Sequence, residues 1–367
     1  MATLANRVFP SYQSGITAKL PKRLEVCADR NPANLVRVGV IGYGYWGPNV
    51  VRNLYGLEDC QLAAICDKNP AGLRRAGQAH PGVELMTDSS ELLTSPEIDA
   101  IAVVTPVWTH FDLAKAALQN GKHVFVEKPF TSTPQQAEDL IELADRSKLK
   151  IMVDHTFLFT GAVRKIRELI DDGTLGDLYY YDSTRVNLGL FQHDVNVVWD
   201  LAPHDFSIMD YIIQEKPEAV VATGGRHLNG LADVAFITVY FPRNVIAHIN
   251  VNWLSPVKVR TTLIGGEKKM LVWNDLEADE KIKVYDKGAQ IANGQGVYDL
   301  LVSYRSGDVW APKVEQAEAL KVELKYFVDC ILNDRTPLND GVAGLRVVKI
   351  LEAADRSLKE RGKIIRL

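Results

Sequence analysis

The fold of this chain is decided by one short stretch, Val36-Arg37-Val38-Gly39-Val40-Ile41-Gly42-Tyr43-Gly44-Tyr45-Trp46-Gly47. Its first six residues are mostly β-branched and predict a buried strand. Three glycines follow at G-x-G-x-x-G spacing and lead into a predicted helix. In such a unit Gly42 makes the tight turn, Gly44 lets the backbone approach a pyrophosphate, and Gly47 lets helix and strand pack closely. The N–H groups at the helix start can then receive an anion.

A carboxylate at the expected distance strengthens this interpretation. A second predicted strand, residues 62–66, ends at Asp67, about twenty residues beyond the glycines. A carboxylate there accepts hydrogen bonds from ribose hydroxyls and repels a 2′-phosphate, so Asp67 favours NAD over NADP. Lys68 beside it weakens that preference, which leaves NADP open. We therefore predict a dinucleotide site rather than an ordinary glycine-containing loop.

Composition limits the class of protein. The chain has 367 residues, enough for two domains of ordinary size. Hydrophobic residues make up 47% and charged residues 24%, the balance of a globular protein. A formal net charge of -4 gives no reason to expect nucleic-acid binding. No apolar run approaches the ~20 residues that a membrane span requires, so no membrane partner is expected.

The cysteines and the first residues of the chain indicate a cytoplasmic protein without a metal site. Residues 1–34 lack the apolar core of a signal peptide and form an extension that is either loose or packed on a partner subunit. Small buried thiols in a reducing cytosol are the simplest interpretation of the cysteines, because they show neither C-x-x-C nor metal-ligand spacing. The four cysteines are Cys27, Cys60, Cys66 and Cys330.

Predicted strands and helices alternate over residues 36–155, which indicates a doubly wound parallel sheet with helices on both faces. Ligands of such sheets bind at the carboxyl ends of the strands. Four polar residues follow predicted strands in this way: Asp67, Thr105, Glu127 and Lys128. We therefore expect them at the same edge of the sheet as the glycine turn.

The pattern changes after residue 160 and predicts an α+β second domain. A series of strands with short turns between residues 219 and 273 indicates a mostly antiparallel sheet, with one face that is polar or covers a partner. Residues 285–312 show no clear period, and two helices are expected at 315–333 and 341–361. The predicted parts are an N-terminal extension, 1–34, a dinucleotide-binding Rossmann domain, 35–157, and a substrate-binding and oligomerisation domain, 158–367.

Lys128 is the first candidate for chemistry. It follows a predicted strand and precedes a proline that fixes the turn. An ammonium beside a nicotinamide can donate to a substrate oxygen and stabilise the alkoxide that develops as hydride moves. The alternative is a lysine exposed in a loop, as most lysines are. Position alone does not decide between the two.

Asp200 and His204 form the second candidate, because their i, i+4 spacing on a predicted helix places both on one face. Histidine can take the proton of a hydroxyl as hydride departs, and Asp200 would orient its ring. A histidine that only caps a helix or is buried is the alternative. A metal phosphohydrolase built on His193-Asp194 and His204-Asp205 is a further one, but it lacks a full ligand set and leaves the glycine turn unexplained.

These motifs together resemble the glucose-fructose oxidoreductase/inositol dehydrogenase (Gfo/Idh/MocA) family, from about residue 36 to the C-terminus. The resemblance rests on the glycine turn with the residues after it, Thr105-Pro106 with His110, Glu127-Lys128-Pro129, and Asp200 with His204. It implies a Rossmann domain followed by an α+β domain whose open sheet builds homodimers or homotetramers.

The resemblance also implies roles for individual residues. Lys128 would be the active-site lysine, His204 the proton-transfer residue and Asp200 its support, while Glu127 and Thr105-Pro106 would border the cofactor. The residues expected to line the cofactor are Gly42, Tyr43, Gly44, Tyr45, Trp46, Gly47, Asp67, Lys68, Thr105, Pro106, His110, Glu127 and Lys128.

The segment before His204 bears on the substrate. Many members have glycines there, whereas Asn196-Val197-Val198-Trp199-Asp200 looks more like the members that act at C3 of nucleotide-linked hexoses. We therefore expect a nucleotide-sugar 3-dehydrogenase or 3-ketoreductase. A dehydrogenase of free inositol or sugar is the alternative enzyme. A regulator that binds NAD and sugar without turnover is the alternative of another class.

Overall fold

Six strands from the first part of the chain form one parallel sheet in the computed structural model. The order β3-β2-β1-β4-β5-β6 shows that the chain starts in the middle and winds outward both ways, as a doubly wound sheet does. The strands are β1 (Val36–Ile41), β2 (Cys60–Cys66), β3 (Glu84–Met86), β4 (Ala100–Val103), β5 (His123–Val126) and β6 (Ile151–Val153). The structure describes residues 35–189, 192, 194–293 and 300–367, so the expectations for residues 1–34 and for Cys27 lie outside it.

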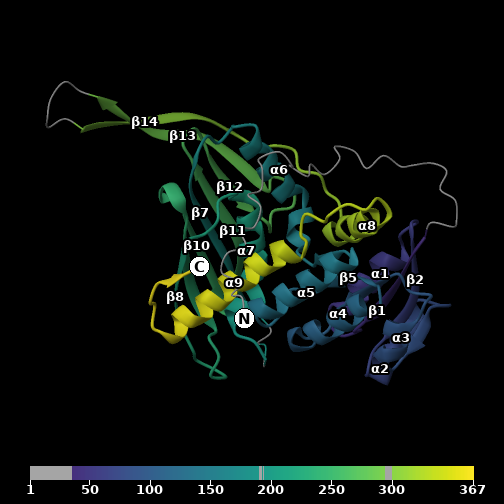
Figure 1. Ribbon diagram of the computed structural model, residues 1–367. Coiled ribbons are helices and arrows are strands. Elements are labelled where there is room, and N and C mark those ends of the chain that lie inside the picture. The colour runs from purple at the N-terminus through teal and green to yellow at the C-terminus, as the bar shows by residue number, and fades with distance from the viewer. Residues whose placement is uncertain (1–34, 190–191, 193, 294–299) are drawn as a thin grey trace. The chain divides into compact units, whose positions relative to one another are not determined.

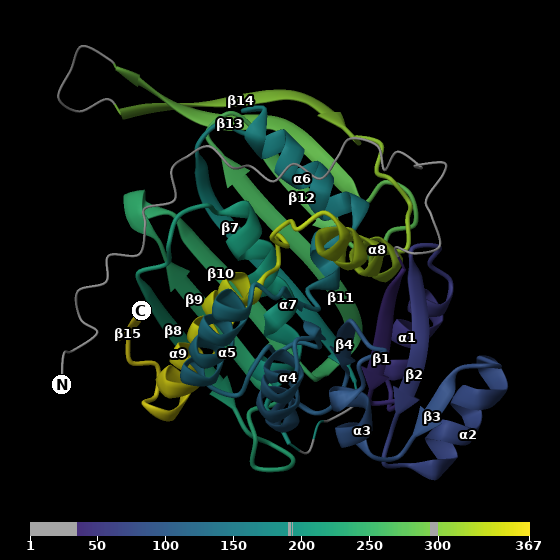
Figure 2. The same cartoon turned by 45° about the vertical axis from the view of Figure 1, so that its right-hand side comes forward.

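Helices connect these strands, and side-chain caps fix where several of them begin (Figure 2). Asn69, Asp88 and Thr133 each accept a hydrogen bond from a backbone N–H in the first turn of the helix that follows. Such caps satisfy N–H groups that have no partner within the helix. The helices are α1 (Gly47–Tyr55), α2 (Pro70–Ala79), α3 (Ser89–Thr94), α4 (His110–Gln119) and α5 (Pro134–Ser147).

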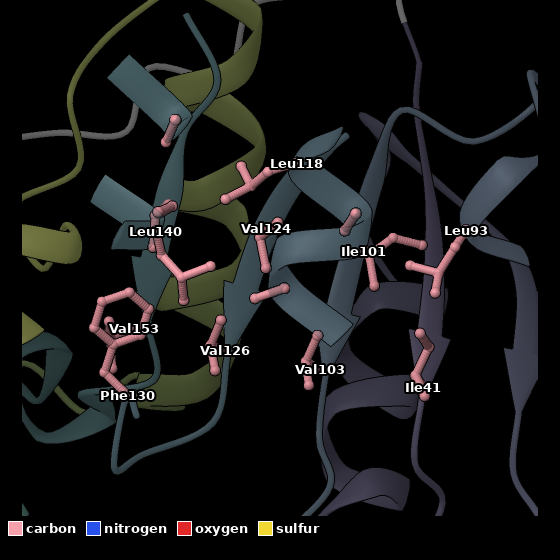
Figure 3. Packing of buried hydrophobic residues seen from close by; sticks show 14 of the residues in the cluster. Ile41, Leu93, Ile101, Val103, Leu118, Val124, Val126, Phe130, Leu140 and Val153 are labelled. Carbon is pink, nitrogen blue, oxygen red and sulfur yellow. The ribbon is translucent and has the colours of Figure 1, made fainter. Parts of the chain in front are cut away.

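The core of this half lies between the sheet and its helices (Figure 3). Ile101 and Val124, from neighbouring strands, are fully buried, and so is Leu140 from α5. Near-continuous apolar strands of this kind are typical of a parallel sheet that is covered on both faces. The packing holds the carboxyl ends of β1, β4 and β5 at one edge, where the predicted site residues follow.

A second sheet of nine strands has the order β14-β13-β12-β11-β7-β10-β9-β8-β15. Only β7 and β10 pair in parallel, and the other neighbours are antiparallel. The predicted fold class, α/β followed by α+β, is confirmed. The strands are β7 (Leu178–Leu188), β8 (Ala219–Gly225), β9 (Val234–Tyr240), β10 (Ile246–Asn252), β11 (Leu254–Gly266), β12 (Met270–Asn274), β13 (Ile282–Asn293), β14 (Leu300–Trp310) and β15 (Ile365–Arg366).

The strands β13 and β14 form a hairpin that the sequence did not predict (Figure 1). Strands are recognised in a sequence by alternation between a buried and an exposed face. Residues 306–310 of β14 are all exposed, so this end of the hairpin has no buried face to impose that alternation. The absence of a period over residues 306–310 has this physical cause.

The last helices bring the end of the chain back to the first sheet. The helix α8 (Ala319–Leu332) packs on α1, and α9 (Gly341–Lys359) packs on α5 as well as on α7 (Figure 1 and Figure 2). In sequence, α6 (Gly161–Asp171) precedes the first strand of the second sheet, β7. The helix α7 (Val197–Ile212) lies between β7 and β8. Among the described residues, no helix is long and apolar enough to cross a membrane.

Candidate active site

The glycine turn after β1 has the geometry that the motif requires at two of its three positions. Gly42 adopts a φ of +106°, and a Cβ there would lie 2.1 Å from the carbonyl oxygen of Val104. A Cβ on Gly47 would lie 2.5 Å from the carbonyl oxygen of Gly42. Both contacts are with backbone, which cannot move aside, so only glycine fits. At Gly44 a Cβ would meet no atom of the described residues within 4 Å, so space lies open in front of the backbone.

This open space fits a dinucleotide. Within the described part of the chain, no acceptor pairs with the backbone N–H groups of Gly44, Tyr45 and Trp46. These N–H groups precede α1, where an anion is stabilised by backbone donors and by the helix dipole. Such a group of free donors beside an open glycine is what a pyrophosphate requires. The residues present therefore fit the cofactor that the sequence predicts.

Asp67 follows β2 and lies beside the same turn. One carboxylate oxygen accepts a hydrogen bond from the backbone N–H of Tyr43 at 2.5 Å, and the other accepts one from the N–H of Asn69 at 2.7 Å. A carboxylate offers about four lone-pair sites, so ribose hydroxyls can still bind. Asp67 therefore fixes the glycine turn through its contact with Tyr43, and its carboxylate can still accept hydrogen bonds from the predicted ribose. Lys68 beside it is exposed.

The other residues expected at the cofactor differ in where they point. Tyr43 is buried, whereas the side chain of Tyr45 is 86% exposed. The indole N–H of Trp46 donates to the Asp154 carboxylate at 3.0 Å, so this side chain reaches from the turn to the end of β6. The Thr105 hydroxyl lies 2.7 Å from that of Thr109.

His110 is the predicted cofactor residue that the structure turns away from the open space. Its side chain is fully buried, with Nδ1 2.9 Å from the Pro129 carbonyl oxygen and Nε2 2.7 Å from that of Thr105. Both ring nitrogens are thus used within the protein. His110 ties the loop after β4, which includes Pro106, to the loop after β5. This contact positions Thr105 instead of presenting the imidazole to a ligand.

Lys128 and Asp200 meet across the two halves of the chain, 72 residues apart in sequence. The Lys128 ammonium donates to the backbone carbonyl of Asp200 at 2.9 Å and lies 3.7 Å from its carboxylate. Both side chains are mostly buried. The other carboxylate oxygen of Asp200 accepts a hydrogen bond from the indole N–H of Trp253 at 3.1 Å. Lys128 is therefore held between the loop after β5 and the helix α7 and is not a freely exposed loop lysine.

His204 lies one turn further along α7, next to Phe157, whose ring centroid is 5.0 Å from that of His204. Its Nδ1 is buried without a hydrogen-bond partner among the described residues. Burial, reinforced by the positive charges of Lys128 and Arg185, lowers the pKa of His204 well below its usual range. The imidazole is therefore neutral at neutral pH and able to accept a proton.

The predicted contact between Asp200 and His204 is not found. The Asp200 carboxylate faces Lys128 and Trp253, and among the described residues no hydrogen bond joins it to the imidazole. The i, i+4 spacing places both residues on one side of α7, but the two side chains turn to different partners. An adjacent carboxylate would raise the pKa of His204, whereas the structure lowers it.

Two buried carboxyls near Glu127, those of Asp154 and Glu323, were not among the predicted site residues. Glu127, Asp154 and Glu323 lie together, and burial beside Asp154 raises the pKa of both glutamates well above the usual value. His155 lies next to them, with both ring nitrogens buried and without a hydrogen-bond partner in the part of the chain that the structure describes, and burial lowers its pKa to about 4. Asp154 follows β6 directly, so the strand-end rule that identified Glu127 would also have found it.

The residues of the predicted metal alternative do not assemble into a site in the described part of the chain. Asp205 binds the hydroxyl of Ser183 and the guanidinium of Arg185, both at 2.6 Å. His193 lies outside the described residues. Among the residues that are described, no group of three His, Cys, Asp or Glu side chains is placed to hold a metal ion.

Comparison with protein families gives two matches. Residues 36–155 match the oxidoreductase family with an NAD-binding Rossmann fold, and residues 163–272 match the GFO/IDH/MocA C-terminal domain. The two matches follow each other along the chain, as the two sheets do. The expected cofactor, NAD, is confirmed by the first match.

Two curated relatives match most of their own length. UDP-N-acetylglucosamine 3-dehydrogenase of Acidithiobacillus ferrooxidans is 27% identical over 322 residues, which covers 85% of this chain and 94% of that protein. Inositol 2-dehydrogenase of Rhizobium meliloti is 25% identical over 349 residues, covering 90% of this chain and 98% of that protein. Both relatives are named as dehydrogenases of CH–OH groups, which confirms the predicted class of enzyme.

Solved structures show the same fold. The structure of the Acidithiobacillus ferrooxidans enzyme has a TM-score of 0.74 at 24% identity, with coverage of 88% of this chain and 97% of that chain. An oxidoreductase from Agrobacterium radiobacter, solved in complex with NAD+, L-tartaric acid and magnesium, has a TM-score of 0.75 at 16% identity, covering 90% and 98%. With the glycine turn, the lysine at the end of β5 and two matched domains in sequence order, this chain belongs to the GFO/IDH/MocA family of NAD-dependent oxidoreductases.

Proposed function

We propose that this oxidoreductase moves a hydride between the nicotinamide and ring carbon C3 of a nucleotide-linked hexose. The observation that carries the proposal is the convergence of Lys128, from the first sheet, with Asp200 and His204 of α7. The Acidithiobacillus ferrooxidans relative, named as a nucleotide-sugar 3-dehydrogenase, supports the choice of substrate class. The inositol dehydrogenases, which match at similar identity, support the alternative of a free polyol.

Each side chain has a task in this reaction. When bound, NAD accepts or returns hydride at the nicotinamide. The Lys128 ammonium donates a hydrogen bond to the oxygen on the reacting carbon and stabilises negative charge there as the C–H bond breaks. Because His204 is neutral, it accepts the hydroxyl proton during oxidation and gives it back during reduction. Asp200 holds the ammonium in place through its carbonyl oxygen and balances its charge.

The protonation states suit this division of roles. Burial, reinforced by the positive charge of Lys128, lowers the pKa of His204 and favours the neutral imidazole that a proton acceptor requires. A histidine whose pKa is strongly shifted by burial and by a neighbouring charge is typical of sites that transfer protons. A regulator that binds the same ligands without turnover has no need of this arrangement. The geometry therefore favours an enzyme over the regulator.

The experiment that tests the proposal uses deuterium. The full chain is mixed with NAD and a UDP-linked N-acetylhexosamine, and formation of reduced cofactor is followed by absorbance. Substrate deuterated at C3 is expected to transfer deuterium to the nicotinamide, whereas substrate deuterated at C4 is expected to transfer hydrogen. Mass spectrometry of the cofactor reads the outcome. Transfer of deuterium from another carbon contradicts C3, and turnover of free inositol alone contradicts the substrate class.

We also propose that the second sheet joins copies of this chain into a homo-oligomer. On β9 and β10 one face is buried, while the other presents Phe236, Tyr240 and Ile246, each about 40% exposed (43%, 39% and 39%). Apolar and aromatic side chains gathered on one exposed face mark an interaction surface. A Phe236→Glu, Ile246→Glu variant is expected to lower the molecular mass measured by light scattering. An unchanged mass contradicts the assignment of this face.

A further inference from the structure

A cavity of about 430 Å³ opens next to the first turn of α7, beside the candidate active site. It lies among five segments: the short helix η3 (Val107–Thr109), the loop after β5, the start of α7 with the residues just before it, the loop between β8 and β9, and the last turn of α9. Its volume falls within the roughly 300–1,000 Å³ of small-molecule sites. The side chains that matter are Trp108, Asp194, Trp199, Arg226, Asp355 and Lys359.

The cavity and the reactive residues share one turn of helix. Trp199 lines the cavity, and the next residue, Asp200, accepts the hydrogen bond from the Lys128 ammonium. A ligand that occupies both the cavity and the site at Lys128 needs two connected parts. A free sugar has no such second part.

The cavity contains a guanidinium and a carboxylate that have no ionic partner among the described residues. Within the described residues, no carboxylate pairs with Arg226 and no cation pairs with Asp194, and both side chains are exposed. The second acid, Asp355, is already engaged by Asn196 at 2.8 Å and Lys359 at 2.7 Å. A free guanidinium is suited to phosphate oxygens, and a free carboxylate to ribose hydroxyls.

The wall of the cavity that carries Arg226 is held in place. The loop after β8 is fixed by Asp233, a fully buried acid that accepts hydrogen bonds from the backbone and the ring of His227, both at 2.7 Å. The carbonyl oxygen of Ala232 accepts the Val197 N–H at 2.9 Å, which joins this loop to the start of α7. A site built before its ligand arrives loses less entropy on binding.

The adenosine end of the cofactor does not account for this cavity. The ribose carboxylate, Asp67, follows β2 on one side of β1, whereas the cavity residues Val107 and Ser132 follow β4 and β5 on the other side. The adenosine end of a dinucleotide therefore lies away from the cavity. Trp108, whose side chain is 56% exposed, is left with an indole face for another aromatic group.

We infer that this cavity binds the nucleoside diphosphate part of the substrate. Arg226 binds the diphosphate, Asp194 binds the ribose hydroxyls, and Trp108 stacks on the base. The inference rests on the proposed function, since it names where the nucleotide of the nucleotide-linked hexose lies. It adds a specificity site outside Lys128, Asp200 and His204.

The test measures binding of UDP, dTDP and GDP to the full chain by titration calorimetry with NAD saturating, so that no nucleotide enters the dinucleotide site. At least one of them is expected to bind. Arg226→Gln and Trp108→Ala are each expected to weaken that binding about tenfold, the size of a lost charged hydrogen bond or stacking contact. Arg356→Gln is the matched control, because Arg356 is exposed on α9 but does not line the cavity.

The outcomes test nucleotide binding in the cavity independently of the proposed reaction. Failure of all three nucleotides to bind, or equal affinity of the parent, Arg226→Gln and Trp108→Ala proteins, overturns the cavity assignment even if a nucleotide sugar is oxidised. Nucleotide binding that both variants weaken supports the assignment even if only a free polyol is turned over. In that case the proposed substrate class falls and the binding site remains.

Discussion

The glycine turn and the reactive group of Lys128, Asp200 and His204 are built in different ways. The turn is one contiguous segment, it acts through backbone N–H groups, and glycine is required by contacts within a few residues of β1 and β4. The reactive group acts through side chains that come from the loop after β5 and from the helix α7, 72 residues further along the chain. We therefore infer that cofactor affinity and turnover depend on separate parts of the molecule. Substitutions in one part should therefore leave the other largely intact.

The largest effect is expected at the turn. Gly42→Ala places a methyl group against the Val104 carbonyl oxygen and forces alanine to a φ of +106°. We expect a loss of stability on the order of 5 kcal/mol, from strain and overpacking together. Thermal or denaturant unfolding measures it. Gly44→Ala is the matched control: its Cβ meets nothing, so we expect normal stability and weaker NAD binding. Equal stability of the two variants would contradict this account of the turn.

The next effect is expected at Lys128. Lys128→Met keeps the length of the side chain but removes the donor to the reacting oxygen. We expect the turnover number to fall on the order of 10³-fold. The dissociation constant of NAD should stay within about twofold of the parent, because the turn is untouched. Steady-state rates and NAD titration measure the two quantities. A variant that loses NAD binding and turnover together would remove the distinction between the two parts.

His204 should give a smaller loss and a change in pH dependence. His204→Asn is expected to lower turnover on the order of 10²-fold. In the parent protein the pKa of His204 is lowered, so oxidation should stay level as pH falls to about 6.5 and decline only below it, once the imidazole becomes protonated. The decline should disappear in the variant. A parent decline that begins above the usual histidine pKa would show that the imidazole is not the base.

The lowered pKa values of His204 and His155 also affect the stability of the protein. The unfolded chain binds a proton at each histidine below about pH 6.5, whereas the folded chain resists protonation at His204 and His155. Because the unfolded state then binds more protons, the free energy of unfolding has its full value above about pH 6.5 and decreases as the solution is acidified. For His155, whose pKa lies at about 4, the loss continues down to that pH. Urea unfolding between pH 7 and 4 measures it.

The two parts also differ in how far the sequence predicted them. The turn and Asp67 were predicted together, because β1, the glycines and β2 are local patterns with fixed spacing. Lys128 and His204 were predicted by position and resemblance, but the partner of Asp200 was not. Helical spacing says which residues share a face of α7, while the side-chain direction depends on Trp253, which lies on a distant segment.

The cluster of three carboxyls, from Glu127, Asp154 and Glu323, shows the same limit of prediction from sequence. Asp154 follows a strand and could have been found by that rule, but Glu323 lies in α8, a helix whose sequence pattern reports only an apolar face. Its approach to Asp154 follows from the return of the chain to the first sheet. The hairpin of β13 and β14 was missed for another reason, since its exposed end carries no pattern of burial.

The smallest effect is expected at Asp200, and it decides between the predicted and the observed contact. Asp200→Asn removes the charge beside Lys128 but leaves the carbonyl oxygen that accepts the ammonium, so we expect turnover to fall only about tenfold. If the carboxylate oriented His204, its removal would also move the acid limb of the pH profile, because a nearby negative charge favours the imidazolium. The structure instead gives the carboxylate to Lys128 and Trp253, so the acid limb should keep its position. Trp253→Phe, which removes the other partner of Asp200, is the matched variant and should behave alike. A shifted acid limb in Asp200→Asn, with none in Trp253→Phe, would restore the predicted pairing of Asp200 with His204.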